Sequence, residues 1–284
     1  MNAGLSYDGQ AVMRDPSASL LLLTPAALNQ RRSRPVLERV RALGFTPFRH
    51  RVHARLAPDV VTSVFQVNRH RIWDTYRYRV LDRLFQAGPS AAVLAAPAAG
   101  TSAAAAGAEL AGAVGALGFL EDGGAPGLPL VYVSPSPERR ADDEAALFEP
   151  DDGERSERPE ELALALDLVE SGSPRAELDR DAVLARLRAA ALLGAWGDLD
   201  DEGRRRVEAT LDGGPGLAAR EVAEPLVAHL RGGERHLLAD FLRHDFDRTR
   251  RGFAWWRQAR VLALYGAEPS IWDELVLLGG MVER

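Results

Sequence analysis

The stretch LLLLTPAAL, residues 20–28, decides the fold of the first half of this chain. Its four leucines have the length of a short buried strand. The proline at position 25 suits the first turn of a helix, because the N–H that it lacks would have no partner there. The stretch therefore predicts a buried strand that turns at once into a helix, and we expect the chain up to about residue 150 to pack around it.

Helical and strand-like segments alternate after this first strand. The apolar residues Val36, Leu37, Val40 and Leu43 fall on one face of a helix, and Gly44 follows as a stop signal. Further segments are a strand at 45–56, a helix at 59–67, an arginine- and aromatic-rich segment at 68–85, a strand at 90–96, a helix at 108–117, a strand at 128–133 and a helix at 141–148. This order is typical of an α+β fold with a ferredoxin-like (split βαβ) antiparallel sheet.

The second half has a helical pattern throughout and no strand pattern. An acidic, proline-bearing stretch with the composition of a linker separates it from the first half. We expect a flexible lead-in at 1–18, an α+β domain at 19–150, an acidic linker at 151–161 and an all-α domain at 162–284.

The composition excludes several kinds of chemistry. The chain has no cysteine and no lysine, so all 35 basic residues are arginines. Without cysteine there are no disulfides, thiolate nucleophiles or zinc sites with sulfur ligands. Without lysine there is no Schiff-base enzyme and no phosphate loop of the Gly-Lys-Ser/Thr type.

Charge and hydropathy limit the location and the partners. The net charge of −6 argues against a general nucleic-acid binder. No apolar segment has the length that a bilayer requires, and the N-terminus lacks the pattern of a secretory signal. We therefore expect a cytoplasmic protein without a membrane contact, and we expect no cofactor and no metal.

Four segments in the right order resemble the nucleoside diphosphate kinases. They read LLLLTPAALNQ from residue 20, VLERVRALGF from residue 36, RLFQAGPSAAVLAAP from residue 83 and VYVSPSPERRADDEAALF from residue 131. The resemblance covers about residues 19–150 and implies that family's α/β sandwich, a nucleotide cleft and a homo-oligomer. The second half resembles no family that we recognise.

The catalytic pattern of that family does not carry over. The phosphate-contacting lysine falls at Thr24, the following aspartate at Ala26, the site tyrosine near Phe65 and the nucleophilic histidine at Val133. Phosphoryl transfer through a phosphohistidine needs an imidazole in line with the phosphate and cations on its oxygens. Ser134 and Ser136 follow Val133, but the sequence indicates no base to activate them. The resemblance therefore implies a degenerate member, a pseudokinase.

An arginine- and aromatic-rich segment lies roughly where the family's cleft opens. Its arginines would hold phosphates and an aromatic ring would stack on a base. The alternative is an ordinary solvated arginine face whose stems cover apolar surface. The candidate ligand-binding residues are Arg69, Arg71, Trp73, Tyr76, Arg77, Arg79 and Arg83.

Two further groups lie in the helical half. His236, Asp240 and His244 would share one face of a helix at 234–246, as an acid–base group or as a plain solvated face. The second group combines arginines with Trp255 and Trp256, which point about 100° apart on a helix, so one is expected in the core and the other at a rim or interface. Such a rim would bind phosphate, an acidic partner or the first half of the chain.

We therefore predict a two-domain protein that binds a nucleotide, a phosphorylated small molecule or a partner protein. The alternative is an enzyme of different chemistry that tailors a nucleotide-derived or specialised metabolite, with His236, Asp240 and His244 or an interdomain cleft. A purely structural interaction protein is the third possibility. Whether any reaction is catalysed stays open at the level of sequence.

Overall fold

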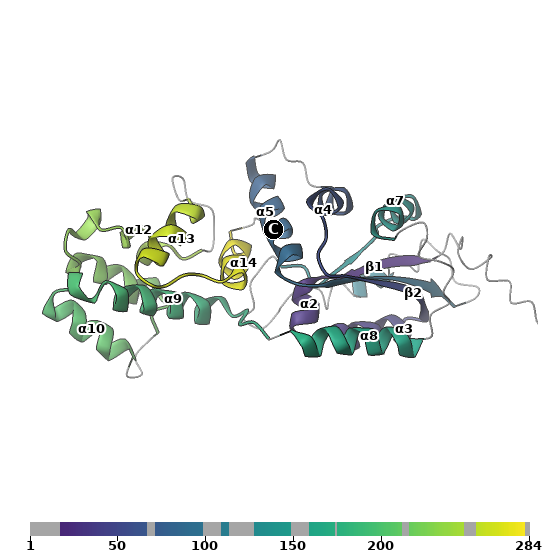
Figure 1. Cartoon of the computed structure of the whole chain (residues 1–284), viewed down its shortest axis with the longest axis horizontal. Coiled ribbons are helices and arrows are strands. Elements are labelled where there is room, and N and C mark those ends of the chain that lie inside the picture. The colour runs from purple at the N-terminus through teal and green to yellow at the C-terminus, as the bar shows by residue number, and fades with distance from the viewer. Residues whose placement is uncertain are drawn as a thin grey trace, which may run out of the picture. The chain divides into compact units, whose positions relative to one another are not determined.

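The computed structural model describes residues 18–66, 72–98, 109–113, 128–148, 159–173, 175–211, 216–246 and 254–281. The chain divides into two compact units (Figure 1). Residues 1–119 with 129–176 form the first unit, and residues 120–128 with 177–284 form the second, which we call the helical unit.

The first unit contains a four-stranded sheet with strand order β2-β3-β1-β4. Strand β1 (Ser19–Leu23) pairs antiparallel with β3 (Ser90–Pro97) and with β4 (Val131–Val133), and β2 (Phe45–His53) pairs antiparallel with β3. This is the strand order of the ferredoxin-like fold, so the predicted fold class is confirmed. All five residues of β1 are buried, as the leucine run predicts.

Helices cover both faces of this sheet (Figure 1). One face carries α4 and α7, and the other carries α3 and α8. Residues 109–113 are also helical. The helices of the first unit are α2 (Pro25–Asn29), α3 (Ser33–Ala42), α4 (Pro58–Phe65), α5 (Ile72–Ala87), α7 (Pro137–Leu147) and α8 (Pro159–Gly172).

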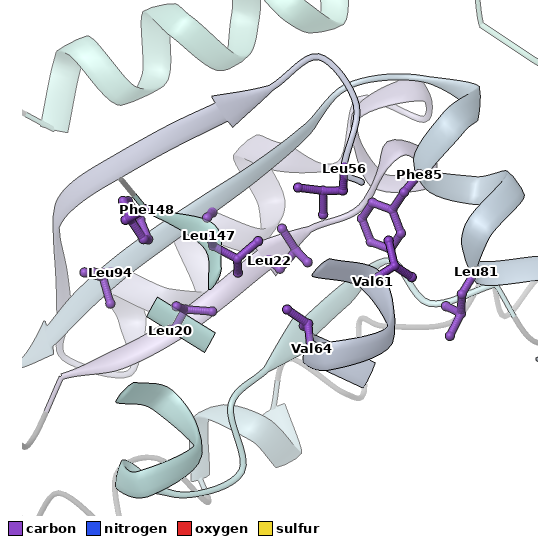
Figure 2. Packing of buried hydrophobic residues seen from close by; sticks show 11 residues of the cluster. Leu20, Leu22, Leu56, Val61, Val64, Leu81, Phe85, Leu94, Leu147 and Phe148 are labelled. Carbon is purple, nitrogen blue, oxygen red and sulfur yellow. The ribbon is translucent and has the colours of Figure 1, made fainter. Parts of the chain in front are cut away.

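The main core of the first unit lies between the sheet and helices α4, α5 and α7. Alternate residues of one strand point to the same face, so Leu20 and Leu22 of β1 enter this core together with Leu94 of β3. From the helices, Val61 and Phe85 meet them, and both are fully buried. Figure 2 shows the labelled side chains gathered over one face of the strands.

Helix α8 belongs to the first unit, whereas we expected the helical domain to begin at residue 162. Its apolar face, with Leu162 and Leu166 buried, packs against β2 and α2. Glu170 accepts a hydrogen bond from the backbone N–H of Ser33 at 3.0 Å. Helical periodicity predicted this helix correctly, but it does not indicate which neighbour the apolar face meets.

The helical unit is built from helices and short 3-10 turns. The predicted helix at 217–230 is broken into α-helical and 3-10 pieces at Pro225, and the one predicted at 234–246 is interrupted at His236, whose backbone is extended. None of the described helices is both long enough and apolar enough to cross a bilayer. The elements are α9 (Arg180–Gly194), η1 (Trp196–Asp198), α10 (Asp201–Leu211), α11 (Arg220–Ala223), η2 (Glu224–His229), η3 (Gly233–Arg235), α12 (Ala239–Arg243), α13 (Trp255–Leu264) and α14 (Ile271–Gly279).

A buried arginine joins the short elements of the helical unit to α9. Arg188 is fully buried, and its guanidinium donates to the backbone oxygens of Leu217 at 2.8 Å, Ala218 at 2.7 Å and His244 at 2.9 Å. Burial lowers the pKa of Arg188 to about 10, which leaves it charged at neutral pH. One side chain thus satisfies three backbone carbonyl groups that lie outside the helices.

Candidate functional site

The turn after β1 is closed by hydrogen bonds within the protein. Thr24 is fully buried and caps α2, where its Oγ1 accepts from the N–H of Ala27 at 3.4 Å. The same hydroxyl donates to the backbone oxygen of Pro129 at 2.6 Å. Thr24 takes the position of a phosphate-binding lysine in the resemblance. Here it joins the first turn to the segment before β4.

A buried carboxylate lies between β4 and α7. Asp143 is fully buried, and its Oδ2 accepts hydrogen bonds from Tyr132 Oη at 2.7 Å and from Ser134 Oγ at 2.6 Å. Burial raises the pKa of Tyr132 to about 12, and the hydrogen bond to Asp143 acts in the same direction. The phenol therefore stays protonated at neutral pH and is a poor nucleophile.

Arg139 supplies the positive charge that this carboxylate needs. Its Nη2 lies 2.8 Å from Asp143 Oδ1, and the same nitrogen donates to the backbone oxygen of Ser63 in α4. A carboxylate buried without a cation or hydrogen bonds would be strongly unfavourable. The Asp143 cluster, which consists of Tyr132, Ser134, Arg139 and Asp143, is therefore neutral overall and ties α7 to β4 and to α4.

Aromatic rings pack against Tyr132 of the Asp143 cluster. The ring of Phe65 lies 5.1 Å from that of Tyr132 and 5.6 Å from that of Phe85, both in tilted geometry. Such distances are typical of stabilising aromatic pairs. Phe65, at the position near which the resemblance places a site tyrosine, is therefore a packing residue that holds Tyr132 in place.

The other described arginines near α7 are also paired with carboxylates. Arg140 lies 2.9 Å from Glu144, and Arg49 of β2 lies 3.4 Å from the same carboxylate. The guanidinium of Arg49 also stacks over the ring of Phe148, 4.6 Å from its centre. In this described region, positive charge is matched by acidic side chains of the protein itself.

The sequence indicated no base for Ser134, and the structure corrects this point. Asp143 Oδ2 is within hydrogen-bond distance of Ser134 Oγ, as a general base would be. However, Ser134 is 7% exposed, and the carboxylate also binds Tyr132 and Arg139. Ser134 is therefore held as a buried donor. Val133, where the resemblance places a nucleophilic histidine, is half-buried in β4 and has no acid–base group.

The structure describes only part of the predicted ligand-binding segment. Arg69 and Arg71 lie outside the described residues, as do the side chains of Trp73, Tyr76 and Arg77 in α5. The two remaining candidates, Arg79 and Arg83, are exposed and lie one turn apart on α5. The grouping of the seven residues stays a prediction.

The three candidates in the helical unit do not share a helix face, because α12 spans only Ala239–Arg243. His244 is buried, and its Nδ1 accepts from the N–H of Phe246 at 3.0 Å. Asp240 is exposed. His236 Nδ1 accepts from the N–H of Leu238 at 3.2 Å. Both histidines thus cap backbone groups, and the described residues contain no group of three or more metal-ligating side chains.

His236 has different neighbours from those that we expected. Its Nε2 lies 3.6 Å from Asp198 Oδ2 and 3.3 Å from Tyr265 Oη. Because Nδ1 accepts a backbone hydrogen bond, the proton of the neutral ring is assigned to Nε2. Burial and the nearby charge of Asp198 raise the pKa of Tyr265. We name Asp198, His236 and Tyr265 the His236 cluster.

Sequence reasoning missed the partners in both clusters. Ser136 and Pro137 form a helix start, since the Ser136 hydroxyl accepts from the N–H of Arg139 at 3.2 Å. With the helix beginning there, Arg139 and Asp143 fall four residues apart and face each other. We had expected the helix only from residue 141. For the His236 cluster, the sequence carries no signal, because its members are far apart in the chain.

The fold and the sites define an α+β domain of ferredoxin-like topology joined to a helical unit. Solved nucleoside diphosphate kinase structures are similar to this chain over about half its length. The enzyme from Aquifex aeolicus is 20% identical, with 47% of this chain and 95% of its own covered and a TM-score of 0.35. A family protein from Babesia bovis is 17% identical, with 52% and 98% covered and a TM-score of 0.36.

A third similar structure is the nucleoside-diphosphate kinase from Borrelia burgdorferi, solved with vanadate and ADP. It is 9% identical, with 51% of this chain and 95% of its own covered and a TM-score of 0.34. No family model matches the chain, and no curated protein matches it. The assignment of the fold therefore rests on the strand order of the chain itself.

Proposed function

We propose that this chain acts by binding a nucleotide or a partner protein, and not by phosphoryl transfer. The observation that carries the proposal is the Asp143 cluster. At the place where the resemblance expects a nucleophile and phosphate ligands, the polar side chains satisfy one another. Transfer of a phosphoryl group needs a nucleophile and cations directed at the phosphate. Tyr132, Ser134 and Arg139 are all committed to Asp143.

The face of α5 is the preferred place for a nucleotide. Arg79 and Arg83 lie one turn apart on α5 and are exposed, and by helical spacing position 76 would fall on the same face. Arginine binds phosphate oxygens through two parallel hydrogen bonds, and an aromatic ring stacks on a base. A bound nucleotide would thus be held by its phosphates and its base, without any reacting group.

Calorimetry and thermal shift with a panel of nucleoside mono-, di- and triphosphates test this proposal. We expect binding that is weakened at least tenfold in Arg79→Ala/Arg83→Ala. A matched control is Arg39→Ala/Arg41→Ala, which removes two exposed arginines from α3. If both double variants bind equally well, the α5 face is not the site. If no nucleotide gives heat or a thermal shift, a partner protein remains as the ligand.

Catalysis is tested separately. Incubation with ATP and GDP should yield no GTP, and mass spectrometry of the protein should show no phosphorylated intermediate. Transfer that is lost in Ser134→Ala would overturn the binding proposal, because Ser134 would then act as a nucleophile with Asp143 as its base.

The His236 cluster favours a second candidate function, an enzyme that tailors a nucleotide-derived or specialised metabolite. Asp198 is partly exposed, and the Tyr265 hydroxyl lies beside it and His236, so a ligand would meet a carboxylate and a phenol. Mass spectrometry of the gently purified protein would identify a bound metabolite. Tyr265→Phe should then abolish its conversion while the fold is retained.

A further inference from the structure

Two helices, one in each unit, carry large apolar side chains that are exposed. On α8, Leu164 is 61% and Leu168 is 64% exposed. On α13, Trp256 is 60% and Leu264 is 74% exposed. Neighbouring apolar side chains at this exposure mark a contact surface more often than a single exposed leucine does.

The exposed stripe of α8 is apolar in the middle and acidic at its edges. At 100° per residue, its exposed positions fall within roughly 140° of arc, opposite the buried Leu162 and Leu166. Leu164 and Leu168 lie at the centre. The flanking residues are Glu160, Glu161 and Asp167. An exposed ion pair, from Arg34 to Asp167 at 3.5 Å, offsets part of this negative charge.

The exposed stripe of α13 has the opposite charge. Trp256, Arg257, Arg260 and Leu264 fall within roughly 100° of arc, and α13 contains no acidic residue. The guanidinium of Arg260 lies 5.7 Å from the ring centre of Trp256, which orients the indole beside a positive charge. Trp255, in contrast, is buried, so the two tryptophans divide between core and surface as the sequence predicts.

Two further exposed leucines of the helical unit are next in sequence to residues that contact Tyr265, at the end of α13. A side chain at Gly194 would meet the backbone oxygen of Tyr265, so α9 and the end of α13 approach closely there. His236 also contacts Tyr265. Leu193 and Leu237, each next to one of these contact residues, are 53% and 48% exposed.

We propose that the α8 stripe of one copy of this chain docks onto the α13 stripe of a second copy. Leucines on α8 would cover Trp256 and Leu264, and the acidic edge of α8 would face Arg257 and Arg260. Opposite charges across such a contact favour this pairing. Two α8 stripes facing each other would bring acidic residues together, and two α13 stripes would bring arginines together, which disfavours both symmetric alternatives.

The contact joins two different surfaces and is therefore heterologous. Such contacts build closed rings or open chains and do not stop at a two-fold dimer. The assembly would also weaken with salt, because its charged edges are exposed. The docking does not depend on nucleotide binding, since neither α8 nor α13 carries a residue of the α5 face.

Two double variants of the full chain test the proposal. Leu164→Gln/Leu168→Gln alters the α8 stripe, and Trp256→Gln/Leu264→Gln alters the α13 stripe. All four positions are exposed, so folding should be retained, which circular dichroism checks. In sedimentation velocity over a range of concentrations, we expect the wild type to associate and each variant alone to sediment as a monomer. A control variant on α10, Arg205→Gln/Glu208→Gln, should associate like the wild type.

Mixing the two variants is the decisive step. Each variant keeps one intact stripe, so a one-to-one mixture should form a heterodimer that grows no further. Failure of the mixture to associate would overturn the proposal, as would association of either variant alone. A wild type that stays monomeric at every concentration would also overturn it. Each charge variant alone, Glu160→Arg/Glu161→Arg or Arg257→Glu/Arg260→Glu, should lose self-association, and a single chain that carries all four changes should regain it.

Discussion

Each unit of this protein buries a charged side chain, and the two charges are satisfied by different partners. In the first unit, three side chains surround the carboxylate of Asp143. In the helical unit, three backbone oxygens surround the guanidinium of Arg188. The first arrangement is an ion pair with hydroxyl donors. The second has a cation with neutral acceptors.

The difference follows from the backbone of each unit. The sheet and long helices of the first unit use most of their own N–H and C=O groups, so a buried charge there depends on side chains. The helical unit has short elements between residues 216 and 246, and their carbonyls need donors from elsewhere. Arginine carries five N–H donors in one plane, which suits this task better than any other side chain.

The largest expected effect is the loss of Arg188. Arg188→Met keeps the apolar stem but leaves three carbonyls without donors, so we expect the helical unit to lose about 3–5 kcal/mol of stability. Urea unfolding followed by tryptophan fluorescence measures this, because four of the five tryptophans lie in that unit. Arg188→Lys should recover only part of the loss, since an ammonium lacks the planar fork. The exposed Arg205→Met is the control, and an equal effect there would refute the role of Arg188 as an anchor.

The next effect is the loss of charge at Asp143. Asp143→Asn is nearly isosteric but leaves the charge of Arg139 without its buried carboxylate, so the first unit should lose about 2–3 kcal/mol. Asp142→Asn is the matched control, because Asp142 is largely exposed and lies 3.8 Å from the same arginine. Hydrogen exchange of the β4 and α7 amides measures the stability of the first unit in each variant. Equal protection in the two variants would show that Asp143 adds nothing beyond a surface charge.

The Asp143 cluster also predicts a dependence on alkaline pH. The pKa of Tyr132 is raised to about 12 in the folded protein, whereas an unfolded tyrosine ionises near pH 10. The protonated Tyr132 phenol therefore contributes to the stability of the folded state below pH 10, and this contribution is lost as the pH rises to 12. Because the ring is only half-buried, we expect a loss of about 1–2 kcal/mol. To measure this loss, the free energy of unfolding is compared between the wild type and Tyr132→Phe from pH 8 to 12. A difference that does not change with pH would contradict the prediction.

The smallest effect compares one helix cap in each unit. Ser270 caps α14 in a reciprocal capping box with Asp273, whereas Ser136 caps α7 through a single hydrogen bond. Ser270→Ala should cost about 1 kcal/mol, and Ser136→Ala a few tenths less. Urea unfolding followed by tryptophan fluorescence measures the loss in Ser270→Ala. Hydrogen exchange of the β4 and α7 amides measures the loss in Ser136→Ala. A larger loss for Ser136 would indicate that its cap also supports the Asp143 cluster.

The fold of the first unit could be predicted from local patterns. Four buried leucines, the proline after them and the order of periodic segments suffice for the strand order, because each segment carries its own apolar face. In the helical unit, periodicity predicted helices at 217–230 and 234–246 that are too long. Pro225 lies in a 3-10 turn inside the first range, and the backbone of His236 is extended inside the second, so these local breaks outweigh the periodicity of the leucines around them.

The sites were less predictable, because they depend on contacts between distant residues. His236 looked like a partner of Asp240 and His244 on one helix, yet its neighbours are Asp198 and Tyr265. The three carbonyl partners of Arg188 leave no trace in the sequence either. Ser136-Pro137 was the one local signal that could have located Arg139 and Asp143 on a common helix.

The position of α8 has a practical consequence for dissecting the protein. The amide oxygen of Asn29 accepts from the N–H of Ala176 at 2.9 Å, and Gln30 donates to the oxygen of Ala176 at 3.1 Å, so the chain is fastened to the first unit beyond the end of α8. A fragment that ends at the acidic stretch would uncover the apolar surface beneath α8 and should aggregate. A fragment that ends after residue 176 keeps α8 over this apolar surface and should be the smallest fragment that folds on its own.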